Sequence, residues 1–242
     1  MILFYVRHGD PIYNPNSLTP LGTRQAEAVA KRLALYGIDE IYSSPSERAL
    51  LTAKPTAEIT KKEITRLDFC DEKYAYEDFA VLNETGRHSW AFQNIAFKRL
   101  FNDNKVLSLG DKWYEYKEFE QYNFEHGVKR VNKGVDEFLL SLGYEHNREK
   151  HFYIPVNPSE KRVALFAHHG FGLCFLSSLL DIPYPLISTH FDIGHTGVTA
   201  IFFGIEDGIC IPSVLTLSND SHLFREGLPT YHNTHIKKNI RF

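Results

Sequence analysis

The hydrophobic and polar positions of the chain predict strands that alternate with helices. An apolar run with aromatic and β-branched residues fills positions 1–6 and predicts a short buried strand. Positions 19–37 carry apolar residues at helical spacing, with Thr19 as N-cap, Pro20 at the first helical position and Gly37 after the end. This order of strand, loop and helix is typical of the start of an α/β fold.

The same alternation continues in two later parts of the chain. Further strands are expected at 40–43, 62–67, 162–167, 198–203 and 209–218. Further helices are expected from 44–46 toward 59, and after residue 167 until about 181–183. Alternating strands and helices predict a three-layer α/β sandwich with a largely parallel sheet.

The segment 68–126 departs from this pattern and predicts helices of uneven polarity, at 89–101 and from 116 into 142. We interpret it as an inserted, mainly helical cap within a single domain of residues 1–242. The segment holds 14 of the chain's 33 aromatic residues, and 12 acidic against 7 basic residues. The rings can build a core for the cap, or some of them can line a substrate pocket.

Composition narrows the class of protein. A chain of 242 residues suits one large domain or a domain with an insertion. The formal charge of −3 gives no global positive field for nucleic acid or an anionic membrane, so any anion site must be local.

No apolar run approaches the roughly 18 residues that span a bilayer, and no signal peptide is visible. The three cysteines are far apart, which favours a reducing cytoplasm. The oligomeric state stays open.

Basic residues gather just after the ends of predicted strands. Arg7-His8-Gly9 follows the first strand, Arg48 lies in the first turn after the second, and His168 follows the fourth. Open α/β sheets bind their ligands at this edge, beyond the carboxyl ends of the strands.

Arg48 gives the strongest physical argument for a bound anion. A cation in the first turn of a helix lies beside the positive end of the helix dipole, which disfavours it unless an anion compensates. Phosphate fits best, because the arginine fork matches its oxygens and free helical amides face it. Alternatively, Arg48 pairs with a carboxylate such as Glu47 or Asp10.

The step Arg7-His8-Gly9 resembles the opening motif of the histidine phosphatase superfamily, the phosphoglycerate-mutase-like fold. The resemblance continues in order through Asn14, 18–22, 43–53, 163–170 and 196–199. Asp10 departs from it, since a glutamate often follows the opening motif. The resemblance covers about 1–67 and 161–218, while the cap matches nothing that we can place.

The resemblance implies a phosphomonoester hydrolase that needs no metal and no cofactor and acts on a small-molecule phosphoester. His8 would attack phosphorus and form a phosphohistidine that water then hydrolyses. The residues implied to hold the phosphate are Arg7, Arg48, Asn14 and His168. His169 is a second candidate for the role of His168, but the apolar face of the following helix favours His168.

A carboxylic acid must protonate the leaving oxygen and later accept a proton from water. The superfamily carries this acid in the variable region after the third strand, which makes Glu72 our choice. Asp71 and Glu84 remain alternatives.

Two other functions compete with a phosphatase. A cofactor-dependent phosphoglycerate mutase would pass the phosphoryl group to a second substrate oxygen and needs a basic cap, for which Arg87, Lys98 and Arg99 are the candidates. The acidic, ring-rich cap favours a phosphatase for an apolar or aromatic ester. A non-catalytic phosphate-binding protein is the second alternative, although the chain retains His8. No histidine pair has the spacing of a metallohydrolase.

Overall fold

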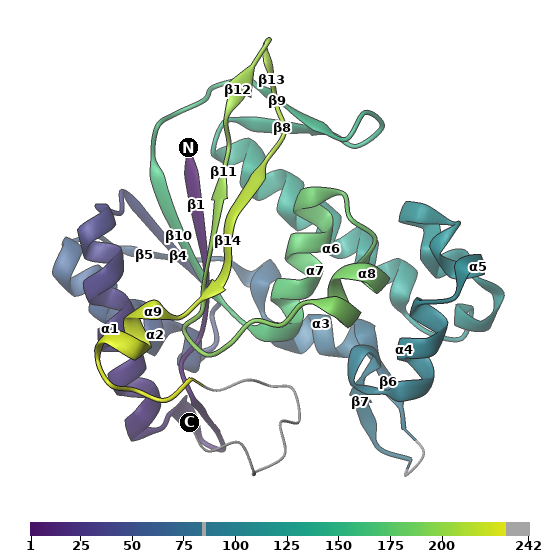
Figure 1. Ribbon diagram of the computed structural model, residues 1–242, viewed down its shortest axis with the longest axis horizontal. Coiled ribbons are helices and arrows are strands. Elements are labelled where there is room, and N and C mark those ends of the chain that lie inside the picture. The colour runs from purple at the N-terminus through teal and green to yellow at the C-terminus, as the bar shows by residue number, and fades with distance from the viewer. Residues whose placement is uncertain (84–85, 231–242) are drawn as a thin grey trace.

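A six-stranded, mostly parallel sheet forms the centre of the computed structural model, which describes residues 1–83 and 86–230 (Figure 1). Its strands, in spatial order, are β14 (Ser213–Asn219), β11 (Val198–Phe202), β1 (Ile2–Arg7), β10 (Arg162–Ala167), β4 (Glu40–Ser43) and β5 (Ile64–Arg66). The pairs β1–β10, β10–β4 and β4–β5 are parallel, whereas β11 runs antiparallel to both of its neighbours.

Helices cover both faces of this sheet (Figure 1). One face carries α1 (Pro20–Tyr36), α2 (Glu47–Thr60) and α9 (Ser221–Arg225). The other face carries α3 (Glu72–Phe79), α6 (Phe124–Ser141), α7 (His169–Leu180) and α8 (Tyr184–His190). Each face buries its own apolar cluster, around Val29 and Leu33 on the first and around Leu165 and Phe171 on the second. The predicted three-layer α/β sandwich is confirmed.

The start and the end of α1 that were predicted from the sequence are confirmed. The Thr19 side chain accepts a hydrogen bond from the Gly22 amide, and Gly37 ends the helix in the left-handed conformation at φ 71°. Two glycines bring this helix against the loop after β1. A Cβ at Gly22 would lie 2.2 Å from the Asp10 carbonyl oxygen, and one at Gly9 would lie 2.7 Å from the Gly22 oxygen.

The segment 68–126 contains several short elements. They are a 3₁₀ turn at Asp68–Cys70, α3, β6 (Ala80–Leu82), β7 (His88–Trp90), α4 (Ile95–Phe101), α5 (Asn104–Leu107), and 3₁₀ turns at Ala91–Gln93, Gly110–Glu115 and Lys117–Phe119. The expected helix over 89–101 is wrong in its first half. The Asn94 side chain accepts from the amides of Ala96 and Phe97 and so begins the helix after residue 94. The division of the chain into a domain and an inserted cap stays a prediction.

Most rings of this segment build a core, as the first of the two interpretations expected. The Trp113 ring lies 5.4 Å from that of Phe101, 5.2 Å from that of Phe124 and 5.6 Å from that of Tyr184 on α8, measured between centroids. Phe119 packs against the same rings and is buried. Such contacts favour packing of this segment against the main body.

Several small strands were not predicted. A hairpin of β2 (Pro11–Tyr13) and β3 (Asn16–Leu18) follows β1. A second sheet contains β8 (Tyr144–Asn147), β9 (Phe152–Pro155), β12 (Ile205–Glu206) and β13 (Ile209–Cys210). The strand expected at 209–218 is therefore two strands, and the strand expected at 62–67 is shorter, at Ile64–Arg66.

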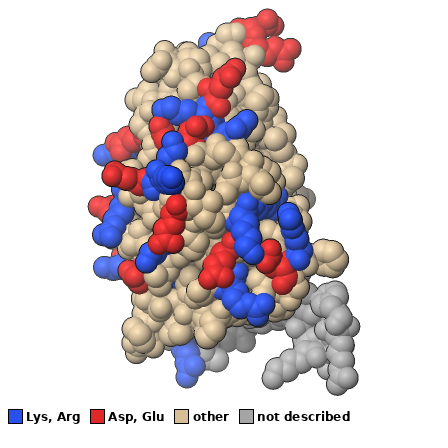
Figure 2. Space-filling model, turned by 90° about the vertical axis from the view of Figure 1, so that its left-hand side faces the viewer, with Lys and Arg blue, Asp and Glu red and all other residues tan. Residues whose placement is uncertain are grey.

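The surface carries charges of both signs (Figure 2), and the three cysteines lie inside the protein. Basic and acidic side chains are interspersed on the face shown in Figure 2. Among the described residues no helix is both long and apolar enough to cross a bilayer. Cys70, Cys174 and Cys210 are all buried free thiols.

Candidate active site

The loops after three neighbouring parallel strands meet at one edge of the sheet. The His8 amide, just after β1, donates to the carbonyl of Ala167 at the end of β10 (2.9 Å). The Ser44 amide, just after β4, donates to the carbonyl of Phe166 on the same strand (2.9 Å). Backbone bonds thus fix the relative positions of the segments that carry His8, His168 and Arg48.

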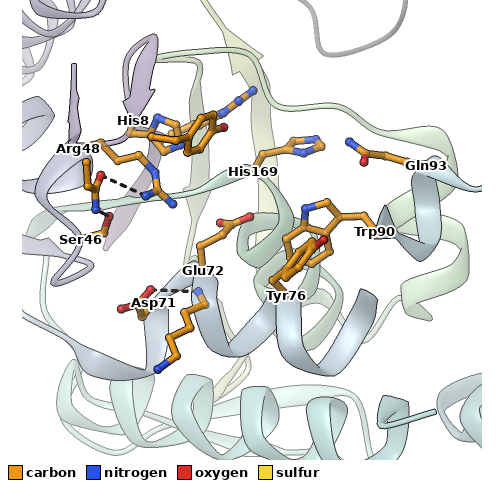
Figure 3. Close-up of a pocket in the computed structure, with 13 residues that line it drawn as sticks. His8, Ser46, Arg48, Asp71, Glu72, Tyr76, Trp90, Gln93 and His169 are labelled. Carbon is orange, nitrogen blue, oxygen red and sulfur yellow. Dashed lines mark hydrogen bonds between the residues drawn. The ribbon is translucent and has the colours of Figure 1, made fainter. Parts of the chain in front are cut away.

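A cavity of about 610 Å³ opens at this edge (Figure 3). It is lined by Arg7, His8, Tyr13, Asn16, Ser46, Arg48, Asp71, Glu72, Lys73, Tyr76, Trp90, Gln93 and His169. Four residues expected at the site, Arg7, His8, Arg48 and Glu72, are among them. Glu84 lies outside the described residues.

His8 has the protonation state and orientation of a nucleophile. Its Nδ1 lies 2.7 Å from the carbonyl oxygen of Gly9, which can only accept, so Nδ1 carries the proton. Burial, together with the nearby charge of Arg7, lowers the pKa of His8 well below its usual value. At neutral pH the ring is therefore uncharged and its Nε2 lone pair is free to react.

The Arg7 guanidinium is positioned by hydrogen bonds to two acceptors. Its Nη1 donates to the carbonyl of Ile193 (2.7 Å) and its Nη2 donates to Nε2 of His195 (2.8 Å). Burial lowers the pKa of His195 to about 3, so that ring is neutral and can accept. His195 was not predicted from the sequence, although it directly precedes the segment 196–199 that the resemblance includes.

Arg48 is the second residue of α2, because the helix begins at Glu47 rather than at Pro45. Its Nη1 donates to Oδ1 of Asn16 (3.2 Å) and its guanidinium lies 5.6 Å from the centroid of the Tyr13 ring. Within the described residues Arg48 forms no ion pair, so pairing with Glu47 or Asp10, the alternative weighed above, is not found.

Asn14, expected to hold phosphate, does not line the cavity and is exposed. Asn16, two residues further on, occupies the cavity wall instead. Besides accepting from Arg48, it donates from Nδ2 to Oγ of Ser46 (3.0 Å), the residue that precedes α2. The β2–β3 hairpin explains the difference, because Asn16 begins the strand that returns to the site.

His168 lies directly behind the cavity and is completely buried. Its ring centroid is 5.2 Å from that of His8, and its Nε2 lies 2.7 Å from Oγ of Ser44. Its Nδ1 has no hydrogen-bond partner among the described residues and lies 3.7 Å from Oε2 of Glu72. His169 lines the outer part of the cavity, where its Nε2 is 2.8 Å from Oδ1 of Asp192.

Glu72, at the start of α3, combines burial with a free oxygen. Its Oε1 accepts from the Gly170 amide (2.9 Å), whereas Oε2 is buried without a hydrogen-bond partner among the described residues. Burial raises the pKa of Glu72 to about 7. Asp71 differs, because its Oδ1 accepts from the Lys73 amide (3.0 Å) and so caps α3.

Several residues at this cavity carry buried polar atoms that have no hydrogen-bond partner within the described part of the chain. They include Nε of Arg7, Nε of Arg48 and Oε2 of Glu72 on the cavity lining, and Nδ1 of His168 behind it. Buried polar groups are normally hydrogen-bonded, so such a set points to a polar ligand. Three of these four groups can donate, which favours an anion.

The rings that line the cavity were not predicted from the sequence. Two of them, Tyr76 and Trp90, come from the segment 68–126, together with Gln93, and the third is Tyr13. Tyr76 follows Glu72 by one helical turn, and this spacing could have shown that the two share a face of α3. No local signal marks Trp90 and Gln93. Within residues 1–83 and 86–230, no group of three or more His, Cys, Asp or Glu side chains is placed to hold a metal ion.

The fold thus places a cavity lined by Arg7, His8 and Arg48 at the carboxyl edge of an α/β sheet. The family model of the histidine phosphatase superfamily (branch 1) matches residues 3–80, which confirms the resemblance found in the sequence. The match covers β1, the hairpin, α1, α2 and the start of the segment with Glu72.

Solved structures of two phosphatases share the fold. A phosphoserine phosphatase from Entamoeba histolytica, in complex with 3-phosphoglyceric acid, is 23% identical, with a TM-score of 0.57, and the match covers 92% of this chain and 98% of that one. A mycobacterial glucosyl-3-phosphoglycerate phosphatase is 18% identical, with a TM-score of 0.57 and coverage of 90% and 98%. No curated protein matches the chain.

Proposed function

We propose that this protein is a phosphatase that hydrolyses phosphate monoesters through a phosphohistidine at His8, without a metal ion. The observation that carries the proposal is the neutral His8 together with one buried polar atom each of Arg7, Arg48, His168 and Glu72 that has no partner among the described residues. The family match over 3–80 and the phosphatases of the same fold support phosphoryl hydrolysis.

In the first step Nε2 of His8 attacks phosphorus opposite the ester oxygen. The N–P bond forms as the P–O bond to the alcohol breaks, and Glu72 gives its proton to the departing oxygen. The Gly9 carbonyl accepts from Nδ1 and so stabilises the charge that the phosphorylated ring acquires.

In the second step water attacks phosphorus and the N–P bond breaks. The ionised Glu72 takes the proton of the water, which returns both residues to their starting states. Arg7, Arg48 and Nδ1 of His168 would hold the phosphoryl oxygens during both steps. Their positions are fixed before substrate binds, and such fixed charge is the main requirement for phosphoryl transfer.

A phosphoglycerate mutase is favoured less, because its reaction needs cations for a second anionic group. Arg87, Lys98 and Arg99 were the candidates, and none of them lines the cavity. Lys98 and Arg99 lie on the exposed side of α4.

The test is to trap the intermediate. Wild-type protein, treated with chelator and quenched in base after mixing with a phosphoester, should carry a base-stable, acid-labile phosphoryl group on His8, found by mass spectrometry. His8→Ala should carry none, and its rate should fall on the order of 10⁴–10⁶-fold, as when a nucleophile is removed.

His126→Ala is a matched control, because His126 is a largely exposed histidine remote from the cavity lining. It should label like the wild type. Label that persists in His8→Ala would overturn the assignment. Phosphate binding without turnover in the wild type would show a non-catalytic binding protein instead.

A further inference from the structure

The cavity has two chemically different halves on either side of Glu72 (Figure 3). The phosphate half contains Arg7, His8, Asn16, Ser46 and Arg48, with the Tyr13 ring beside Arg48. The leaving-group half consists of Tyr76, Trp90, Gln93 and His169. Because Glu72 protonates the ester oxygen in the proposed reaction, the alcohol of the substrate must extend into the leaving-group half.

Fixed aromatic rings form the wall of the leaving-group half. The Tyr76 hydroxyl donates to the carbonyl of His88 (2.9 Å), so the residue offers its ring rather than its hydroxyl to a ligand. The Trp90 ring lies 5.3 Å from that of Tyr76 at 79°, and is stacked at 5.3 Å on the buried ring of Phe92. Rings already held in place bind a flat apolar group with little loss of entropy.

Among the described residues that line the cavity, Lys73 is the only Lys or Arg outside the phosphate half. The ammonium of Lys73 lies over the outward Tyr74 ring, 5.7 Å from its centroid. His169 lies beside Asp192, and burial lowers its pKa, so its ring is neutral at pH 7. A second anionic group on the alcohol would lose water there without gaining a fixed cation as its partner.

We propose, on the basis of the phosphatase function above, that the substrate is a monophosphate ester of an uncharged alcohol that carries an aromatic ring close to the ester oxygen. The ring packs against Tyr76 and Trp90. The exposed Gln93 amide, at the far end of this wall, offers a hydrogen bond to a polar group on the ring (Figure 3). An ester of a carboxylated alcohol is disfavoured.

A panel of alkyl esters with similar leaving oxygens tests this substrate class. The chelator-treated wild type should show its highest kcat/KM with 2-phenylethyl phosphate, an intermediate value with glycerol 1-phosphate, and the lowest with 3-phosphoglycerate and phosphoserine. We expect about tenfold between the first two, which corresponds to about 1.4 kcal/mol and is in the range of one or two aromatic contacts.

Two substitutions assign the preference to the wall. Trp90→Leu and Tyr76→Leu should each reduce the ratio of kcat/KM for 2-phenylethyl phosphate to that for glycerol 1-phosphate. Tyr74→Leu should leave this ratio unchanged, since Tyr74 lies on the same helix but does not line the cavity.

A third substitution adds the missing charge. Gln93→Lys should raise the ratio of kcat/KM for 3-phosphoglycerate to that for glycerol 1-phosphate, because a cation then faces the carboxylate. A wild type that hydrolyses these esters without preference for the ring, or that prefers the carboxylated esters, would overturn the inference and leave the phosphatase function standing. A wild type no faster than His8→Ala on every ester and on p-nitrophenyl phosphate would overturn both.

Discussion

The reactive side chains of the phosphate half, Arg7 and His8, are held by hydrogen bonds, whereas the Trp90 ring of the leaving-group half is held by contacts with other rings. Arg7 is fixed by the Ile193 carbonyl and His195, and His8 by the Gly9 carbonyl. Trp90, in contrast, is positioned by Tyr76 and Phe92. Backbone bonds tolerate little displacement, while a ring wall can change shape through a single substitution.

This difference indicates that the two halves of the cavity have different roles in the proposed reaction. The phosphate half meets the same chemical group in every monoester, and its geometry is tied to the sheet. The leaving-group half meets the variable part of the substrate, and its two rings and Gln93 lie in the segment 68–126, outside the central sheet. We therefore expect substitutions in the first half to change the rate on all esters, and those in the second to change the choice among esters.

Beyond the His8 test, the largest effect is expected at Glu72, between the two halves. Glu72→Gln should slow hydrolysis of an alkyl phosphate by about 10²–10⁴-fold, because the alkoxide cannot leave without a proton. Hydrolysis of p-nitrophenyl phosphate should fall much less, since nitrophenolate leaves unaided. Steady-state rates on both esters check the prediction.

Asp71→Asn is the control for this test, because Asn can still cap α3. It should not show the dependence on leaving group. If it does, and Glu72→Gln does not, the proton donor is Asp71. Equal losses on both esters in Glu72→Gln would indicate a positioning role.

The same residue predicts a pH dependence. The pKa of Glu72 is raised to about 7 by burial, so the acid form needed for the first step is lost as pH rises through 7. The rate on an alkyl ester should fall over that range, and Glu72→Gln should lack the fall. The second ionisation of the ester itself, near pH 6, is common to both proteins and cancels in their ratio.

The two halves also differ in how far the sequence revealed them. Arg7 and His8 follow a continuous apolar run, and Arg48 follows a short strand expected at 40–43. Parallel strands place their carboxyl ends together, so the convergence of these residues could be predicted. The bounds of α1 were also predicted correctly from Thr19, Pro20 and Gly37, because each of these residues acts on the local backbone.

Trp90 and Gln93 could not be found in this way. Their positions depend on a short hairpin and on ring contacts between residues distant in the sequence, for which periodicity gives no signal. Asn14 failed for a related reason, because the β2–β3 hairpin brings Asn16 rather than Asn14 to the cavity wall. His195, which accepts from Arg7, lies 188 residues further along the chain, in a loop.

The next largest effect is expected in the phosphate half. Arg48→Ala should lower the rate by about 10²–10³-fold, in the range of one lost electrostatic donor, and weaken inhibition by vanadate. The loss should be similar for esters with and without a ring. Arg24→Ala, which removes an exposed arginine of α1, is the control and should change neither quantity. A loss confined to one class of ester would contradict the division between the halves.

A smaller effect is expected where the two halves touch. A Cβ at Gly170 would lie 2.3 Å from the Trp90 ring and 2.8 Å from Oε1 of Glu72. Gly170→Ala should displace both and cost about 10–10²-fold on an alkyl ester, as small misplacements of reacting groups do. Vanadate affinity should be retained.

A double-mutant cycle separates the two contacts of Gly170. If the Trp90 ring transmits the displacement, Gly170→Ala combined with Trp90→Ala should be little slower than Trp90→Ala alone. Strict additivity would mean that the new methyl group acts on Glu72 directly.

The smallest effect is expected at Lys73, the third cation on the cavity wall. Its ammonium lies over the Tyr74 ring and its side chain is exposed, so its field on a bound phosphate is screened by water and salt. Lys73→Met should change the vanadate inhibition constant by less than about twofold, the size of a weak surface contact. Inhibition measured at low and high salt checks this, because a screened charge would have its largest effect at low salt. A loss comparable to that of Arg48→Ala would place Lys73 in the phosphate half and extend the region of fixed positive charge past Glu72.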